Sequence, residues 1–290
     1  MSVEIIQQRL LQYNCQTVLE QENALKEIAQ EIALLALARS GFFRIAAFQG
    51  GTCLRILYGL ERFSEDLDFV LEKPDKKFVW ETYVHNMQEE FSAYGFKLEV
   101  KDRAKLDNVI RTAFLKADSE GGMLVIKDLR RNKPQLRIKL EIDTNPPAGS
   151  NYELKYLDFP SAYSVKTQDL PSLFAGKCHA LLCRDYIKGR DWYDFIWYVS
   201  RNTPINFNLL NNALVQAGPW KNQELHITQK WFLGELRNKI NMIDWAVAKR
   251  DVEKFLRPRE MFSLEAWSKE FFISRLEKLN EYLINEDIAP

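Results

Sequence analysis

The sequence predicts an α+β fold in which a mixed sheet with flanking helices is followed by a C-terminal helical unit. Two observations lead to this prediction. As far as residue 168, short apolar or alternating segments that are typical of strands are interspersed with helical segments. Beyond that point, apolar residues recur at the helical steps of three and four. We therefore expect an N-terminal helical segment at residues 1–43, an α/β core at 44–168 and a helical domain at 169–290.

The elements of the N-terminal part follow from these patterns in order. A helix is expected from Gln21 to Arg39, because its apolar residues keep helical spacing and Gly41 follows as a stop. A strand at Arg44–Phe48, a glycine turn and a helix at Cys53–Leu60 come next. The remaining expected elements are a strand at Asp66–Leu71, a helix at Lys76–Tyr94 and strands at Phe96–Val100, Met123–Ile126 and Leu136–Ile142.

The C-terminal part is expected to be helical throughout. Four segments carry helical apolar spacing, namely Leu170–Arg184, Asp191–Ser200, His226–Lys249 and Leu264–Leu283.

Composition excludes several classes of protein. The 290 residues include 40 Lys and Arg and 40 Asp and Glu, which describes a globular protein rather than a disordered chain or a histone-like binder of bulk nucleic acid. The longest apolar stretch, Ile32–Ala38, is far too short to cross a membrane. The N-terminus lacks the basic start and apolar core of a secretory signal, so we expect a cytoplasmic protein. The spacing of the four cysteines fits neither a disulfide framework nor a zinc site, and we expect reduced thiols.

Two acidic residues stand out in the strand expected at Asp66–Leu71. Asp66 and Asp68 are two residues apart, so their carboxylates project from the same face of the strand. Two like charges side by side repel each other, and an apolar strand carries them only with a divalent ion or a basic partner. Oxygen ligands favour Mg²⁺ or Mn²⁺, and Mg²⁺ commonly binds together with substrate phosphates.

A glycine turn precedes this acidic pair. Gly50, Gly51 and Thr52 connect the first expected strand to the following helix. Glycines let the backbone approach a phosphate closely, and the helix start offers N–H groups. Ser64 adds a hydroxyl close to the acids. The turn and the acidic pair together predict a nucleotide and metal site.

The block from Phe48 to Leu71, FQGGTCLRILYGLERFSEDLDFVL, resembles the signature of the DNA polymerase beta type nucleotidyltransferase superfamily. The resemblance implies a nucleotidyltransferase fold, an NTP substrate and two Mg²⁺ ions held by two acids on one strand and a third acid on a neighbouring strand. The third acid is expected in Leu136–Asp143, LRIKLEID, where alternation places Arg137, Lys139, Glu141 and Asp143 on one face. Superfamily members flank this acid with apolar residues on both sides, so Glu141 is preferred to Asp143. The alternative for this strand is a solvated charged face without a catalytic role.

A second block, Leu170–Val199, resembles the AbiEii/AbiGii family of toxin nucleotidyltransferases, which includes the MenT toxins. The matching positions are Lys177, Ala180, Leu181, Leu182, Arg184, Arg190, Asp191 and Asp194. This resemblance implies that Lys177 binds the triphosphate and that Asp191 is an active-site acid, with Asp194 as a further candidate. Asp191 also suits the start of the following helix, so a capping role is an alternative for it.

The family resemblance further implies a toxin that modifies RNA, with the 3′ end of tRNA as one acceptor, and a cognate antitoxin as partner. A basic run agrees with an RNA acceptor, since Lys127, Arg130, Arg131, Lys133, Arg137 and Lys139 lead into the strand of Glu141. Two alternatives stay open. One is a small-molecule nucleotidyltransferase of the antibiotic-modifying kind, and the other is a catalytically idle binding partner.

Overall fold

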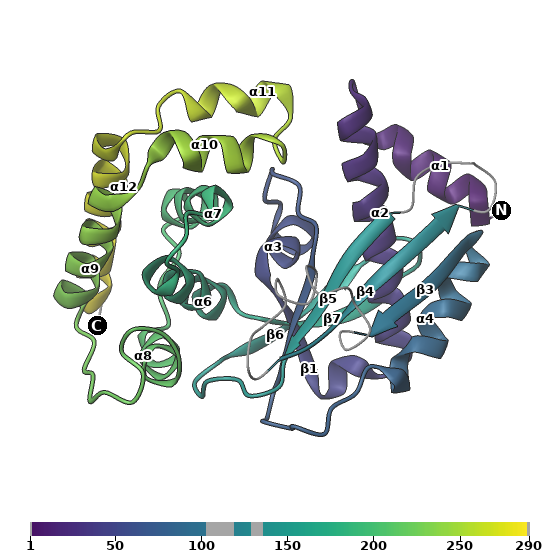
Figure 1. Ribbon diagram of the computed structural model, residues 1–290, viewed down its shortest axis with the longest axis horizontal. Coiled ribbons are helices and arrows are strands. Elements are labelled where there is room, and N and C mark those ends of the chain that lie inside the picture. Colours follow the sequence, from purple (N-terminus) through teal and green to yellow (C-terminus); the bar gives the residue numbers. More distant parts are fainter. Residues whose placement is uncertain (1, 103–118, 129–135, 289–290) are drawn as a thin grey trace. The chain divides into compact units, whose positions relative to one another are not determined.

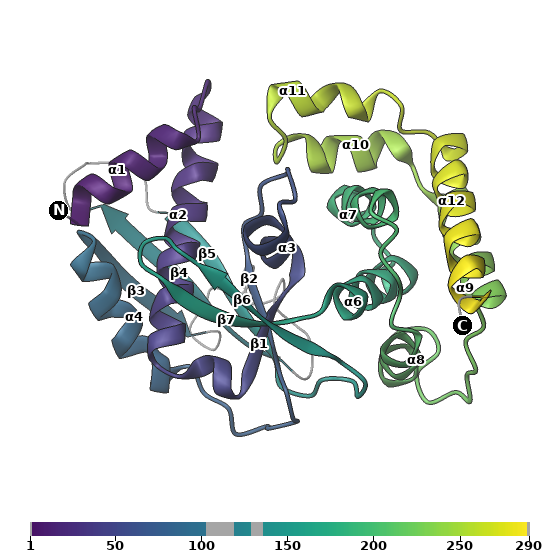
Figure 2. The same cartoon turned by 180° about the vertical axis from the view of Figure 1, so that it is seen from behind.

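The computed structural model describes residues 2–102, 119–128 and 136–288. The chain folds into two compact units, and each is described by itself. Unit 1 comprises Met1–Pro146 and Tyr152–Thr167, and unit 2 comprises Pro147–Asn151 and Gln168–Pro290. Figure 1 shows the sheet of unit 1 and the helices of unit 2, and Figure 2 shows the same elements from behind.

Unit 1 is built on one mixed sheet. Its strands are β1 (Ala46–Gln49), β2 (Leu67–Leu71), β3 (Phe96–Asp102), β4 (Ser119–Asp128), β5 (Leu136–Asp143), β6 (Tyr152–Leu157) and β7 (Tyr163–Gln168). In the described part of the chain they form a seven-stranded sheet in the order β3-β4-β5-β2-β1-β7-β6. Strand β2 runs parallel to β5 and antiparallel to β1, so the central strands bring both orientations together. The predicted mixed sheet is confirmed.

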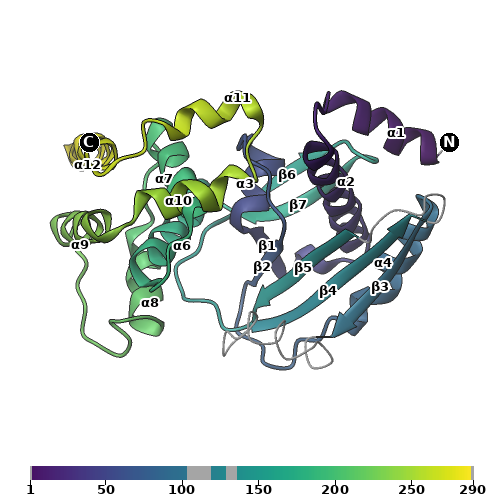
Figure 3. The ribbon, with the colours of Figure 1, turned by 45° about the horizontal axis from the view of Figure 1, so that its top comes forward.

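Helices cover this sheet, as Figure 3 shows from a tilted view. They are α1 (Ser2–Gln12), α2 (Val18–Arg39), α3 (Gly50–Tyr58) and α4 (Glu81–Ala93), with a short 3-10 helix at Phe42–Arg44. Helix α2 begins where the Thr17 hydroxyl accepts the N–H of Glu20, and it packs against α4 and β5. An aromatic cluster fills the core beside it, with the ring of Phe42 4.9 Å from Phe69 and 5.5 Å from Trp80.

Unit 2 is helical. It contains α6 (Leu170–Cys183), α7 (Gly189–Ser200), α8 (Phe207–Gln216), α9 (Gln229–Met242), α10 (Trp245–Glu253), α11 (Pro258–Met261), a 3-10 turn at Phe262–Leu264 and α12 (Lys269–Ile288). Helix α6 starts where the Asp169 carboxylate accepts the N–H of Ser172. The core includes Trp192 and Phe272, and the half-buried Trp245 stacks on Phe272 with ring centroids 3.9 Å apart. The predicted C-terminal helical unit is confirmed.

Several element predictions were wrong or incomplete. The helix expected at His226–Lys249 is two helices, because Asp244 caps a new helix by accepting the N–H groups of Ala246 and Val247. The helix expected from Lys76 begins only at Glu81. The sequence analysis also did not assign α1, β6, β7 and α8. Within the described ranges, no helix combines the length and apolar character needed for a membrane span.

Candidate active site

The sheet of unit 1 brings the three predicted acids onto one face. Asp68 on β2 is the register partner of Glu141 on the parallel strand β5, so both side chains point to the same side of the sheet. Asp66 precedes Asp68 by two residues, at the point where β2 begins, and shares that side. The carboxylates of Asp66 and Asp68 therefore lie on the same face as that of Glu141.

The surroundings of Glu141 and Asp143 differ. Glu141 is 7% exposed and stands beside Asp68, whereas Asp143 pairs with Val70 at the end of β5. The Asp143 carboxylate accepts the backbone N–H of Asn145 at 2.9 Å, a bond that stabilises the turn after the strand. This geometry favours Glu141 as the third acid.

Lys139 supplies a positive charge on the same face. Its Nζ lies 2.5 Å from Oε2 of Glu141. Burial lowers the pKa of Lys139, but the neighbouring charges of Glu141, Asp66 and Asp68 outweigh burial and raise it above the usual value. Among the residues that the structure describes, no three carboxylate, imidazole or thiolate groups converge into a preformed metal site. The acids share a face, and Glu141 is paired with an ammonium group.

Gly50 and Gly51, which the sequence analysis placed in a turn before a helix at Cys53, are the first two residues of α3, directly after β1, and this glycine turn abuts the acids. Gly50 has a φ of +80°, and a Cβ placed on it would lie 2.6 Å from Oδ2 of Asp68. A Cβ on Gly51 would lie 2.5 Å from Nη2 of Arg62 and 3.1 Å from the Ser64 hydroxyl. Gly50 is therefore required by close approach and by a backbone conformation that other residues rarely adopt, whereas a Cβ at Gly51 would displace the end of the Arg62 side chain.

Thr52 is fully buried in the first turn of α3. Its hydroxyl donates a hydrogen bond to the backbone carbonyl of Asp66. The side chain thus holds the segment that carries Asp66, and the part of Thr52 suited to a phosphate is its backbone N–H at the helix start.

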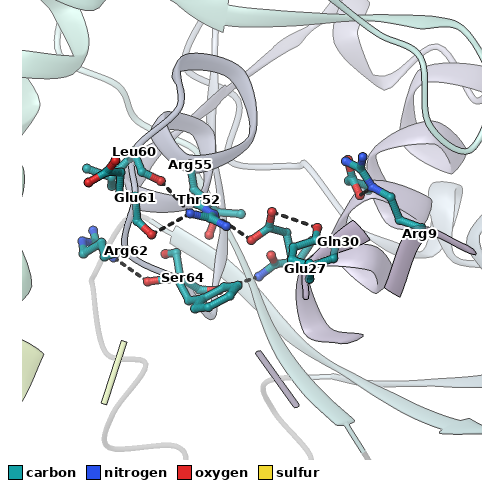
Figure 4. Close-up of polar contacts among 12 residues, drawn as sticks. Arg9, Glu27, Gln30, Thr52, Arg55, Leu60, Glu61, Arg62 and Ser64 are labelled. Carbon is teal, nitrogen blue, oxygen red and sulfur yellow. Dashed lines mark hydrogen bonds and ion pairs between the residues drawn. The ribbon is translucent and has the colours of Figure 1, made fainter. Parts of the chain in front are cut away.

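Hydrogen bonds from α2 and α3 fix the loop that leads into β2, as Figure 4 shows. Arg55 donates to the carbonyl oxygens of Leu60 at 3.0 Å and Glu61 at 2.6 Å, and its Nε pairs with Glu27 at 2.8 Å. Gln30 donates to the Ser64 carbonyl at 3.2 Å. This loop carries the residues next to the glycine turn, so its tethering positions them.

Arg62 is a residue of this loop that the sequence analysis did not single out. It is only 2% exposed, and its Nη1 donates to the carbonyl of Phe63 at 3.0 Å. Its place within the block resembling the superfamily signature was the available signal. The structure adds that its guanidinium lies against Gly51, beside Ser64.

Unit 2 contains a buried ionic cluster built from α6 and α7. Nζ of Lys177 lies 2.7 Å from Oδ1 of Asp191 and 2.8 Å from Oδ2 of Asp194. Arg184 pairs with the other carboxylate oxygen of Asp191. Asp191 is 3% exposed and Asp194 fully buried. Each buried carboxylate therefore has a cationic partner, as such burial requires.

These contacts set the charge states of the cluster. Burial raises the pKa of Asp191, but Lys177, Arg184 and Lys188 outweigh it and hold that pKa well below its usual range. Burial lowers the pKa of Lys188 to about 8. Helix α7 begins at Gly189, and no side chain caps its start. Asp191 lies inside the first turn and binds cations, which disfavours the capping alternative.

A comparison with protein families completes this description. The family model of the nucleotidyl transferase AbiEii toxin of type IV toxin–antitoxin systems matches residues 32–274. The chain belongs to this family. Membership makes it a nucleotidyltransferase toxin of a toxin–antitoxin system and implies an NTP substrate and an antitoxin partner.

Two solved structures from Helicobacter pylori share the fold of this AbiEii family member. One is a candidate nucleotidyltransferase with a TM-score of 0.50 and 16% identity, matched over 90% of this chain and 95% of that one. The other, JHP933, also has a TM-score of 0.50 and 16% identity, over 92% and 97% of the two chains. A comparison with curated proteins found no significant match.

The cysteines and two of the histidines of this AbiEii toxin lie on other segments than the acids and the Lys177 cluster. All four cysteines are free thiols, and of the buried reduced thiols that the sequence predicts, Cys53 and Cys178 are buried, whereas Cys15 and Cys183 are half-buried. His85 is exposed and pairs with Glu89, and the His179 ring contacts the carbonyl of Ala217.

Proposed function

We propose that this AbiEii toxin transfers a nucleoside monophosphate from an NTP to an RNA acceptor and releases pyrophosphate, with the 3′ end of tRNA as the favoured acceptor. The observation that carries the proposal is the register pairing of Asp68 with Glu141 on one sheet face, with Gly50 directly against Asp68. This arrangement sets carboxylates beside a turn and helix start that suit phosphates.

Asp66, Asp68 and Glu141 are the residues that would hold Mg²⁺ or Mn²⁺. They fit a hard divalent cation because all three offer carboxylate oxygens on one face. The missing side chain of Gly50 keeps the space beside Asp68 open, since a Cβ there would crowd its carboxylate. When bound, such a metal would lower the pKa of the acceptor hydroxyl and neutralise charge on the triphosphate. The chain itself orients the carboxylates, since Thr52 fixes the backbone of Asp66.

The triphosphate is assigned to the groups around the glycine turn. Gly50 and Gly51 permit close approach, while Thr52 offers its backbone N–H and Ser64 its hydroxyl. The buried guanidinium of Arg62 adds a positive charge beside Gly51.

In unit 2, Lys177 is assigned to the triphosphate and Asp191 to the active site through the family resemblance. An ammonium group donates up to three hydrogen bonds, so Lys177 can contact a phosphate oxygen in addition to Asp191 and Asp194. Two buried carboxylates hold its Nζ in place, which orients the charge before substrate arrives.

An RNA acceptor is supported by the basic run. Arg137 and Lys139 belong to β5 and Lys127 to β4, whereas Arg130, Arg131 and Lys133 lie outside the described residues. Arg137 and Lys139 share the face of Glu141, because alternate residues of a strand point to the same side. Cations beside the acids suit a polynucleotide backbone.

The test is transfer of labelled nucleotide. Purified protein is incubated with each of the four α-labelled NTPs, Mg²⁺ and total RNA, with Asp68→Ala as the control. We expect a discrete labelled RNA band with the wild-type protein and none with the control. Label on an added aminoglycoside instead of RNA would support the small-molecule alternative, and no label on either acceptor would contradict the proposed reaction.

A further inference from the structure

The sheet face that carries Asp66, Asp68 and Glu141, called the acidic face below, also carries the lysine Lys139. Lys139 and Glu141 are two residues apart on β5, and their side chains meet on one face with Nζ 2.5 Å from Oε2. Leu140 is the register partner of Leu67 and Glu141 that of Asp68, so Lys139 lies at the end of the β5–β2 pairing where the chain enters β2 after Asp66. The ammonium group therefore contacts Glu141 on the face that also carries Asp68.

This position has an electrostatic consequence. Three carboxylates on neighbouring strands repel one another when no cation is bound. The side chains of Lys139 and Glu141 are only 25% and 9% exposed, so their attraction is less screened than that of a surface pair. A divalent ion brings two charges to the same oxygens and must compete with the ammonium group for Glu141.

We propose that the Lys139 ammonium group is the counter-cation of Asp66, Asp68 and Glu141 in the metal-free protein, and that a divalent cation displaces it from Glu141. This rests on the proposed function, which makes the three acids metal ligands. In the structure the Glu141 carboxylate is engaged by Lys139. Metal binding is thereby coupled to release of a lysine.

Two further variants separate this role from general effects of charge. Arg137 lies on the same face of β5, two residues before Lys139, and is exposed. Arg137→Met therefore removes one positive charge from the strand without touching Glu141. Lys139→Arg keeps the charge and changes the shape, whereas Lys139→Met removes the charge at similar length.

The first measurement is Mn²⁺ binding to the full chain without nucleotide, followed by electron paramagnetic resonance. Lys139→Met is expected to bind Mn²⁺ roughly tenfold more tightly than the wild type, which corresponds to about 1.4 kcal/mol. Arg137→Met and Lys139→Arg should stay within about threefold of the wild type. Equal or weaker Mn²⁺ binding by Lys139→Met would overturn the proposed displacement.

The second measurement is thermal unfolding in EDTA, which tests the metal-free protein and does not depend on how tightly it binds a metal. Without the Lys139 ammonium group the three carboxylates repel one another, so Lys139→Met should melt about 3 °C below the wild type. The melting temperature of Arg137→Met should not be lowered in this way. Saturating Mn²⁺ should reduce the difference in melting temperature between Lys139→Met and the wild type. An unchanged melting temperature in EDTA would overturn the counter-cation role. If neither the wild type nor Lys139→Met bound Mn²⁺, the metal assignment of the proposed function would fall, and with it the displacement.

Discussion

Glu141 and Asp143 share one face of β5 but have different partners. Glu141 stands level with Asp68, whereas Asp143 bonds the backbone N–H of Asn145. A carboxylate that contacts the metal stabilises charge in the transition state, whereas one that stabilises a turn does not.

Glu141→Gln should therefore reduce the rate of transfer by roughly 1,000-fold, and Asp143→Asn by less than about tenfold. Initial rates with saturating NTP measure both, and circular dichroism controls for folding. Small and equal effects would place the third ligand elsewhere, and the reverse order would assign it to Asp143.

The glycine turn offers a matched pair of substitutions. Gly50 is the first residue of α3 and Gly59 follows its last residue, with φ of +80° and +75°, so alanine is strained by about 1 kcal/mol at either position. Only at Gly50 does a Cβ meet Asp68, at 2.6 Å, since no atom lies within 4 Å of a Cβ at Gly59. Gly50→Ala should lose transfer activity by at least about 100-fold, while Gly59→Ala keeps it. Each variant is assayed equally far below its own melting temperature. Similar activities of Gly50→Ala and Gly59→Ala under these conditions would argue against close approach at Gly50.

For single residues, the sequence predicted which side chains share a strand face, and the structure added the groups that they contact. Alternation in LRIKLEID predicts Leu136, Ile138, Leu140 and Ile142 on the buried face; the last three are buried and Leu136 is half-buried, because period two is a local property of a strand whereas burial at its end is not. The bond from Thr52 to the Asp66 carbonyl and the burial of Arg62 depend on contacts between segments. Local spacing carries no information on such contacts.

Among the elements, α6 and α7 are held together by opposite charges as well as by aromatic packing. Lys177 comes from α6 and Asp191 and Asp194 from α7, and the rings of Phe174 and Tyr198 stack at 4.4 Å. The lysine on an otherwise apolar helix was the signal for a buried anion. Which acids would meet it depended on how the two helices pack.

This ion cluster predicts a pH dependence of stability. The folded state lowers the pKa of Asp191, so its ionised form stabilises the fold above the ordinary aspartate pKa of about 3.9, and that contribution is lost as pH falls below it. Asp191→Asn should cost roughly 3 kcal/mol of unfolding free energy at pH 7, because it leaves buried cations underpaired. Urea unfolding between pH 7 and pH 3 should show the difference from wild type shrinking below about pH 4. A difference that is constant over this range would contradict a role for the charge.

Element boundaries were predictable where apolar spacing was strong and unpredictable where a single capping residue decides them. Helices α2 and α6 follow their apolar stripes. The break between α9 and α10 depends on the Asp244 cap, which helical periodicity does not reveal because apolar residues continue across it. Strands β6 and β7 were missed although YELKYL and YSVKTQ alternate apolar and polar residues, so their signal was present in the sequence.

At the scale of the whole molecule, charge is balanced while its distribution along the sequence is uneven. With 40 basic and 40 acidic residues, the protein has no net attraction for nucleic acid, so an RNA acceptor must be bound through a local cluster of cations. The basic run that leads into the strand of Glu141 is the segment we assign to this role. A small acceptor would not require it, and this difference makes acceptor class testable by salt dependence.

Charge reversal of Arg130 and Arg131 should therefore weaken RNA binding and flatten its dependence on salt, because each lost phosphate contact reduces the log-log slope by about 0.7 to 0.9. Fluorescence anisotropy of labelled tRNA across a salt series measures the slope, and NTP binding should be unchanged. A matched control is reversal of Lys76 and Lys77, which are adjacent and exposed and change the net charge equally. If both double variants weaken RNA binding equally, the effect reflects net charge rather than a docking surface. If Arg130→Glu with Arg131→Glu leaves affinity and slope unchanged, the run is a solvated face, and RNA must contact the toxin through other residues.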